Sequence, residues 1–158
     1  GFYYAIRDNL IIAKAAVSSD PVYINELTLA LNGFLNNWEA SNFATVIYYA
    51  NDAKNKIINA NNTSDPAEKN NLLGSALHSY AEAVAFSYGW LGLDAKLITD
   101  SEIEDILELL LVKPGQAPES YRFAQEPALL DNFDQIIDLI QGVYGFSETQ
   151  VNGFFVNN

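Results

Sequence analysis

One histidine and one glutamate, four residues apart, are the side chains of this sequence best suited to chemistry. His78 is the only histidine in the 158 residues, and Glu82 is the only charged residue between Lys69 and Asp94. Residues four apart lie on the same face of an α-helix. On that face an imidazole and a carboxylate can share a metal ion, or the carboxylate can orient the imidazole and raise its pKa.

Two interpretations of this pair stay open. In the first, His78 and Glu82 are structural: they are buried, they bond each other, a tyrosine hydroxyl or a backbone carbonyl, and they fasten helices together. In the second they bind a metal. Because two ligands on one helix are too few for a catalytic metal, further ligands would have to come from Glu39, Asp52 or residues 94–100. We predict no catalytic residue, and His78, Glu82 and Glu39 are the candidate metal ligands.

The helix that must position this pair spans residues 70–92. It is apolar on nearly all sides, which is typical of a helix in the middle of a fold. Its residues around the pair are mostly small, and such a stripe lets another backbone approach closely; they are Gly74, Ser75, Ala81, Ala85 and Gly89. We therefore expect 70–92 to be the most buried helix, with His78 and Glu82 facing a neighbouring helix.

Composition limits the classes of partner and cofactor. Twenty acidic residues against eight basic ones give a net charge of −12, which repels nucleic acids and anionic membrane surfaces. The absence of cysteine excludes disulfides, thiol nucleophiles and cysteine-based metal sites. The longest apolar runs are too short to span a bilayer, so we predict no transmembrane segment. Because the chain begins at Gly1 and has no methionine, we expect a processed or trimmed product.

Helical spacing of apolar residues recurs along the whole chain, and no stretch alternates as a strand does. Helices are predicted over 2–17, from Asp20-Pro21 onward, and from Trp38 onward. Gly33 and the pair Asn36-Asn37 are expected to break the second of these helices. Others are predicted from Asp65-Pro66, from a capping box at Ser101, from Glu126-Pro127 to Gly142 or Gly145, and from a capping box at Ser147. Residues 113–125 are expected to form a long loop, and Glu39 to lie at a helix start, where its charge is favourable.

These elements predict an all-α fold, an antiparallel bundle of about six helices around the central helix. No boundary signal divides the chain, so 1–158 is predicted to be a single helical domain. Aromatic residues are predicted to belong mainly to the core. Tyrosines 3, 4, 48, 49 and 121 are the candidates for a groove that binds a sugar or a peptide.

The central helix also carries a resemblance. The run from Leu77 to Ala83, with Phe86 and Trp90, resembles the histidine-containing helix of uncharacterised Gram-negative surface lipoproteins whose domain is a helical bundle. Residues 98–103 and 143–146 are similar to that group's pattern as well, so the resemblance covers roughly 38–146. It implies an exported protein, in the periplasm or on the cell surface, with 1–158 as its C-terminal part and a possible lipid anchor upstream.

A more distant resemblance is to imelysin-like proteins, helical-bundle surface proteins linked to iron acquisition. Their Gly-x-His-x-x-Glu motif would correspond here to Gly74, His78 and Glu82, although both spacings are longer in this chain. Because the sequence has no complete catalytic set and its composition is acidic and lightly charged, we predict a non-enzymatic binding or interaction module with a protein, peptide or glycan partner and no cofactor. The alternative is a metal-binding protein of iron handling, or a metal-dependent hydrolase, that uses His78 and Glu82.

Overall fold

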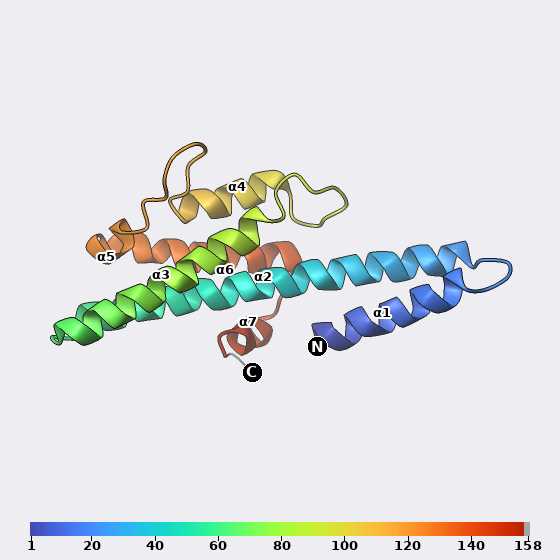
Figure 1. The fold of residues 1–158 in the computed structure, drawn as a ribbon, viewed down its shortest axis with the longest axis horizontal. Coiled ribbons are helices and arrows are strands. Elements are labelled where there is room, and N and C mark those ends of the chain that lie inside the picture. Colours follow the sequence, from blue (N-terminus) through green and yellow to red (C-terminus); the bar gives the residue numbers. More distant parts are fainter. Residues whose placement is uncertain (157–158) are drawn as a thin grey trace. The chain divides into compact units, whose positions relative to one another are not determined.

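The computed structural model describes residues 1–156, and these residues are helical without any strand, which confirms the predicted all-α class. The helices in chain order are α1 (Phe2–Val17), α2 (Ile24–Asn62), α3 (Pro66–Tyr88), α4 (Asp100–Leu109), α5 (Arg122–Gln125), the 3₁₀ helix η1 (Pro127–Leu130), α6 (Asp131–Tyr144) and α7 (Glu148–Phe154) (Figure 1). They form two compact units. Unit 1 consists of Gly1–Asn42 with Asp94–Leu97, and unit 2 of Phe43–Leu93 with the chain from Ile98 onward. That both units fold as one domain stays a prediction.

Unit 1 is a helical hairpin made of α1 and the first part of α2. The predicted helix over 2–17 is confirmed. The predicted start of the next helix at Asp20-Pro21 is wrong, because α2 begins at Ile24 and Pro21 lies in the connection. The predicted break at Gly33 and Asn36-Asn37 is also absent. The Asn37 amide donates to the carbonyl of Gly33 (2.8 Å), so this asparagine bonds within the helix instead of ending it.

Unit 2 is a bundle in which α3 packs on α4, α4 packs on α6, and α5 and η1 pack together beside α6. Its core is formed by apolar residues with no exposed surface, on α2, α3, α4 and α6: Phe43, Val46, Ile47, Ala50, Ala53, Ala60, Ala83, Ile103, Ile106, Phe133, Ile136 and Ile140. Seven of these twelve come from α2 and α3, and six of those from α2 alone. Helix α3 is buried along one face rather than on all sides.

The helix ends of unit 2 follow their capping residues. Asp65 accepts a hydrogen bond from the amide of Ala67 (2.9 Å) and Pro66 takes the first helical position, as predicted. The capping box at Ser147 is confirmed too. The box of α4, predicted at Ser101, lies two residues earlier: Thr99 and Glu102 have the same spacing and satisfy each other's amides.

The segment 113–125, predicted as a loop, ends in the short helix α5, which places Phe123 in the core. Among residues 1–156 no helix has the length and hydrophobicity to cross a membrane, in line with the prediction from the sequence.

Candidate functional site

The predicted pair lies on the surface of α3 rather than inside the bundle. The His78 side chain is 68% exposed, so its predicted burial is wrong, while Glu82 is 34% exposed. The imidazole Nε2 lies 3.9 Å from Glu82 Oε1, which is too long for a direct hydrogen bond. The His78 ring meets the ring of Tyr49 edge-on, with centroids 6.5 Å apart. The pair is thus a loose surface contact beside an aromatic ring.

The polar connection between α2 and α3 is made by other residues. Ser79 is 1% exposed, and its hydroxyl donates to Asp52 Oδ2 (2.5 Å) while accepting from Lys56 Nζ (3.2 Å). Lys56 also forms an ion pair with Asp52 one turn away. Asp52, named from the sequence as a possible metal ligand, is thus bonded to a lysine and a serine. Burial, and after it the Glu82 carboxylate, raises the pKa of nearby Tyr49.

The candidate metal ligands are not brought together. Glu39 was predicted to lie at a helix start, but it lies within α2. Its side chain is 1% exposed, and both carboxylate oxygens accept a hydrogen bond from the amide of Leu97 (2.9 Å each). Glu39 belongs to unit 1 and His78 to unit 2. Within the described range, no three histidine, aspartate or glutamate side chains are grouped so that they could hold a metal ion.

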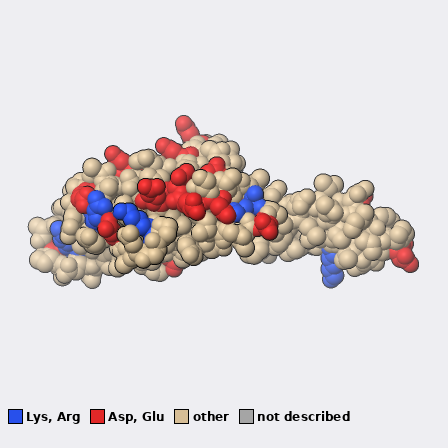
Figure 2. All heavy atoms as spheres, turned by 90° about the horizontal axis from the view of Figure 1, so that it is seen from above, with Lys and Arg blue, Asp and Glu red and all other residues tan. Residues whose placement is uncertain are grey.

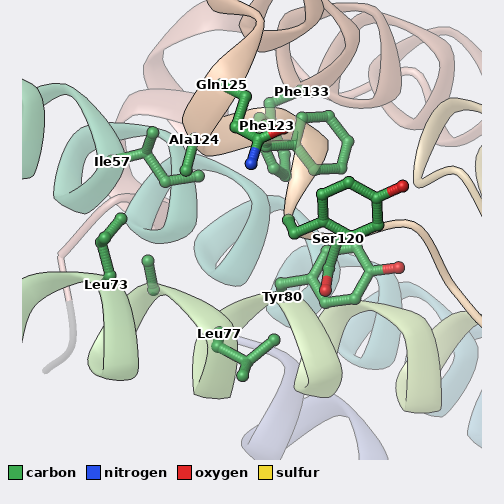
Figure 3. A pocket seen from close by; sticks show the side chains of 11 residues that line it. Ile57, Leu73, Leu77, Tyr80, Ser120, Phe123, Ala124, Gln125 and Phe133 are labelled. Carbon is green, nitrogen blue, oxygen red and sulfur yellow. The ribbon is translucent and has the colours of Figure 1, made fainter. Parts of the chain in front are cut away.

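The hollow best suited to a ligand is an apolar cavity of about 300 Å³ in unit 2. One wall is the face of α3 that carries Leu73, Ala76, Leu77 and Tyr80, which follow one another at helical spacing. The other walls come from α2, from 120–125 and from α6: Ile57, Ser120, Tyr121, Phe123, Ala124, Gln125 and Phe133. In Figure 3, Leu73 and Tyr80 lie on the α3 side of this space, and Phe123 and Ala124 lie on the opposite side.

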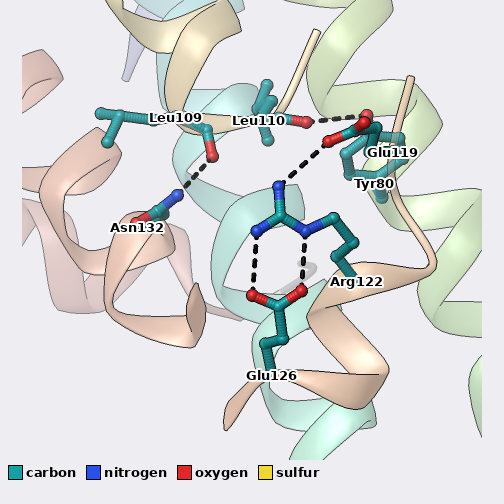
Figure 4. Close-up of polar contacts among 7 residues, drawn as sticks. All are labelled: Tyr80, Leu109, Leu110, Glu119, Arg122, Glu126 and Asn132. Carbon is teal, nitrogen blue, oxygen red and sulfur yellow. Dashed lines mark hydrogen bonds and ion pairs between the residues drawn. The ribbon is translucent and has the colours of Figure 1, made fainter. Parts of the chain in front are cut away.

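Three aromatic rings that line this cavity pack on one another and form its floor. The rings of Phe123 and Phe133 lie 4.7 Å apart, and Phe123 lies 6.0 Å from Tyr80. The Tyr80 hydroxyl donates to the carbonyl of Leu110 at the end of α4 (2.8 Å) (Figure 4). Burial raises the pKa of Tyr80 to about 12, so this phenol is neutral and its hydrogen bond is intact at neutral pH.

The helix that closes the cavity, α5, is fixed by Arg122. The guanidinium donates to both carboxylate oxygens of Glu126 (2.7 and 2.9 Å) and to Glu119 (3.0 Å) (Figure 4). These bonds lower the pKa of Glu126 and raise that of Arg122. The fork thus holds the ends of α5 together while the next residue, Phe123, points into the core.

The polar atoms that the cavity offers are uncharged. Within residues 1–156 the side chains of Ser120 and Gln125 have no hydrogen-bond partner, so both are available to a ligand. At the rim Leu77 is 54% exposed and Tyr121 61% exposed. The site is therefore an apolar hollow with a hydroxyl and an amide at its edge.

Sequence reasoning found only one member of this site, Tyr121, among the tyrosines proposed for a groove. A signal for the wall of α3 exists, because Leu73, Ala76, Leu77 and Tyr80 are spaced as one apolar face. The opposite wall depends on how residues 120–125 fold back toward α3, and no hydrophobic periodicity in the sequence predicts that fold. Comparison of the chain with protein-family models, with curated proteins and with solved structures finds no match.

Proposed function

We propose that this chain is a non-enzymatic binding module and that the cavity between α3 and α5 holds its ligand. The observation that carries the proposal is the lining of that cavity: eleven side chains, most of them apolar and none of them charged. Proteins bind small molecules in such concave apolar sites, with a few polar groups that fix orientation.

The dimensions and chemistry of the cavity favour a small, uncharged, mainly apolar ligand. A cavity of about 150 Å³ accommodates one benzene ring, so one of about 300 Å³ suits two fused rings or a short branched chain. The hydroxyl of Ser120 and the amide of Gln125 can each pair with one polar group on that ligand. A carboxylate or phosphate would meet no cation in the lining and would be repelled by the net charge of −12.

2-Naphthol is a probe of this size and polarity, and it tests the proposal directly. By methyl NMR on the intact chain we expect saturable shifts of Ile57, Leu73 and Leu77, with a Kd of about 1 mM or tighter for eleven heavy atoms. The charged analogue 2-naphthoate should bind at least tenfold more weakly, because its desolvated carboxylate finds no partner.

Filling the cavity should abolish binding. Ala124 lines the cavity, and Ala124→Leu places a branched side chain inside it, whereas Ala85→Leu adds the same atoms to an exposed position on α3. We expect loss of 2-naphthol binding in Ala124→Leu alone, with far-UV circular dichroism unchanged in both. Equal binding by all three proteins, or shifts spread over the whole surface, would overturn the proposal.

The location of the module and its alternative function have tests of their own. The resemblance to Gram-negative surface lipoproteins supports export to the periplasm or the cell surface, and a reading frame with a signal peptide and a lipobox cysteine upstream of Gly1 would support it further. The alternative, a metal-dependent protein that uses His78 and Glu82, requires stoichiometric iron or zinc in untagged protein and its loss in His78→Ala.

A further inference from the structure

The hairpin of unit 1 leaves two apolar rows on its surface. On α1, Tyr3, Leu10 and Val17 are seven residues apart and are 70%, 45% and 53% exposed. On α2, Ile24, Leu31 and Trp38 are also seven apart and are 62%, 43% and 52% exposed. A seven-residue spacing keeps side chains on one side of a helix, as in coiled coils and helical bundles.

Both rows lie on the same side of the hairpin. Inward-facing residues of α1 include Asn9 and Ala13, and those of α2 include Ala30 and Gly33. In each helix the exposed row is displaced from the inward-facing residues by about a quarter turn in the same rotational sense. Because the two helices are antiparallel, equal displacements bring both rows to one side, which we call the row face.

The row face is large for a surface that stays in water. With roughly 200 Å² for each large apolar residue, six residues at these exposures present roughly 650 Å². The largest apolar patch of a typical monomer is about 300–600 Å², and a standard interface buries about 800 Å² on each partner. The six apolar side chains of one row face thus supply most of the area that a stable dimer needs from each partner.

Most of the negative charge of the chain lies outside unit 1, so two hairpins can meet with little electrostatic repulsion. Unit 1 has three basic and five acidic residues, a net charge of −2, which leaves −10 of the total of −12 to unit 2. Arg7 is paired with Asp8 beside it. On the face shown in Figure 2 the acidic side chains gather over unit 2, whereas the hairpin shows few charges.

We propose that unit 1 is a self-association module: two hairpins pack through their row faces into a four-helix bundle related by a two-fold axis. A two-fold axis lets one self-complementary patch bury itself on both copies. Four helices with apolar positions at heptad spacing form a closed core, which a two-helix hairpin does not have. The two hairpins run antiparallel, because each continues at Phe43 into a chain segment of charge −10 and a parallel pairing would bring the two Phe43 ends together.

The oligomeric state of the full chain tests this. Sedimentation velocity should give a dimer, twice the 17.5 kDa of one chain, at micromolar concentration. Leu31→Glu buries an unpaired charge at the centre of the interface and should weaken dimerisation about 100-fold. The matched control is Leu29→Glu, since Leu29 is 72% exposed but lies on the opposite side of the hairpin, and it should leave the dimer intact.

The direction of the hairpins can be read from single thiols, because the chain has no cysteine of its own. In the antiparallel dimer Leu31 lies near the two-fold axis and Ile24 far from it, so Leu31→Cys should form a disulfide dimer on oxidation and Ile24→Cys should not. An Ile24→Cys chain that cross-links as readily as Leu31→Cys would overturn the antiparallel arrangement, and so would the absence of a disulfide dimer in Leu31→Cys.

Three outcomes would overturn self-association itself. The first is a wild-type chain that stays monomeric at 100 µM, and the second is equal weakening by the two glutamate variants. The third is a monomer that co-sediments with phosphatidylcholine vesicles and loses this in Leu31→Glu, because the row face would then be a lipid-binding surface. Circular dichroism of every variant should show that the helices remain.

Discussion

The side-chain amide of Asn9 on α1 lies directly over Gly33 on α2. A Cβ atom at Gly33 would clash with Asn9 Oδ1 and would lie within 2.9 Å of two further amide atoms. The amide is held in this position because its Nδ2 donates to the carbonyl of Ala5 (2.8 Å). The hairpin therefore closes where a residue without a side chain meets a residue anchored to its own helix.

Gly33→Ala should destabilise the hairpin by about 1 kcal/mol. Alanine in a helix interior gains about 1 kcal/mol over glycine, but the displaced Asn9 amide and the overpacked contact cost roughly 1–3 kcal/mol. Hydrogen exchange of α1 amides measures this loss locally. The matched control is Gly74→Ala, because a Cβ there meets nothing within 4 Å and only the gain remains. A Gly33→Ala variant with α1 amides better protected than in wild type would contradict the prediction.

The buried Ser79 should contribute more stability than the equally buried Ser87 on the same helix. Ser79 links α3 to Asp52 and Lys56 on α2, whereas the Ser87 hydroxyl donates to Ala83 of its own helix. Ser79→Ala should lower the free energy of unfolding by about 1 kcal/mol. Ser87→Ala should change it by less, because alanine also favours the helix. Urea unfolding of the two variants measures the difference, and equal losses would show that the contact with α2 contributes nothing.

The sequence predicted the helices better than their surfaces. The helix starts at Asp65 and Ser147 were found because capping is decided by residues next to one another, although the similar signal at Asp20-Pro21 does not begin a helix. The exposure of His78 was not, because small residues such as Gly74, Ala81 and Ala85 were taken as a sign of burial. These residues are exposed in the structure. Glycine and alanine are compatible with either environment, so they say little about which face turns inward.

The role of Glu39 shows a second kind of limit. An acidic residue among aromatic ones predicts either a helix end or a ligand, yet Glu39 accepts a hydrogen bond from the amide of Leu97, 58 residues later in the chain. No local pattern contains that pairing. The cavity is subject to the same limit. Its wall on α3 can be predicted from helical spacing, whereas the wall formed by the turn at Tyr121 and Phe123 cannot.

Glu39 should hold the segment 94–97 in place. Its two oxygens are the acceptors for the Leu97 amide, and a hydrogen bond to a charged group contributes about 1.5–3 kcal/mol. Glu39→Ala should therefore raise the hydrogen-exchange rate of the Leu97 amide by at least tenfold, while Glu39→Gln, which keeps an acceptor of the same shape, should raise it less. The amide of Ile103 in unit 2 serves as the internal reference. Unchanged exchange at Leu97 in Glu39→Ala would refute this assignment.

The titration of Tyr80 should lower the free energy of unfolding of unit 2 at alkaline pH. Its pKa is about 12 in the folded chain and 10.0 when unfolded, so between these values the folded state holds a proton that the unfolded state has lost. The stabilising contribution is fully present below pH 10 and is lost as the pH rises through 12.

Tyr80→Phe keeps the ring of the cavity floor but leaves the carbonyl of Leu110 without its donor, at a cost of about 1–2 kcal/mol at pH 8. Between pH 9 and pH 11.5 the variant should then lose less stability in urea unfolding than the wild type does, so that the two curves converge. Tyr121→Phe is the control, since Tyr121 is 61% exposed and its loss should leave the pH dependence of the wild type unchanged. Parallel curves for Tyr80→Phe and the wild type would show that the buried phenol does not titrate with unfolding.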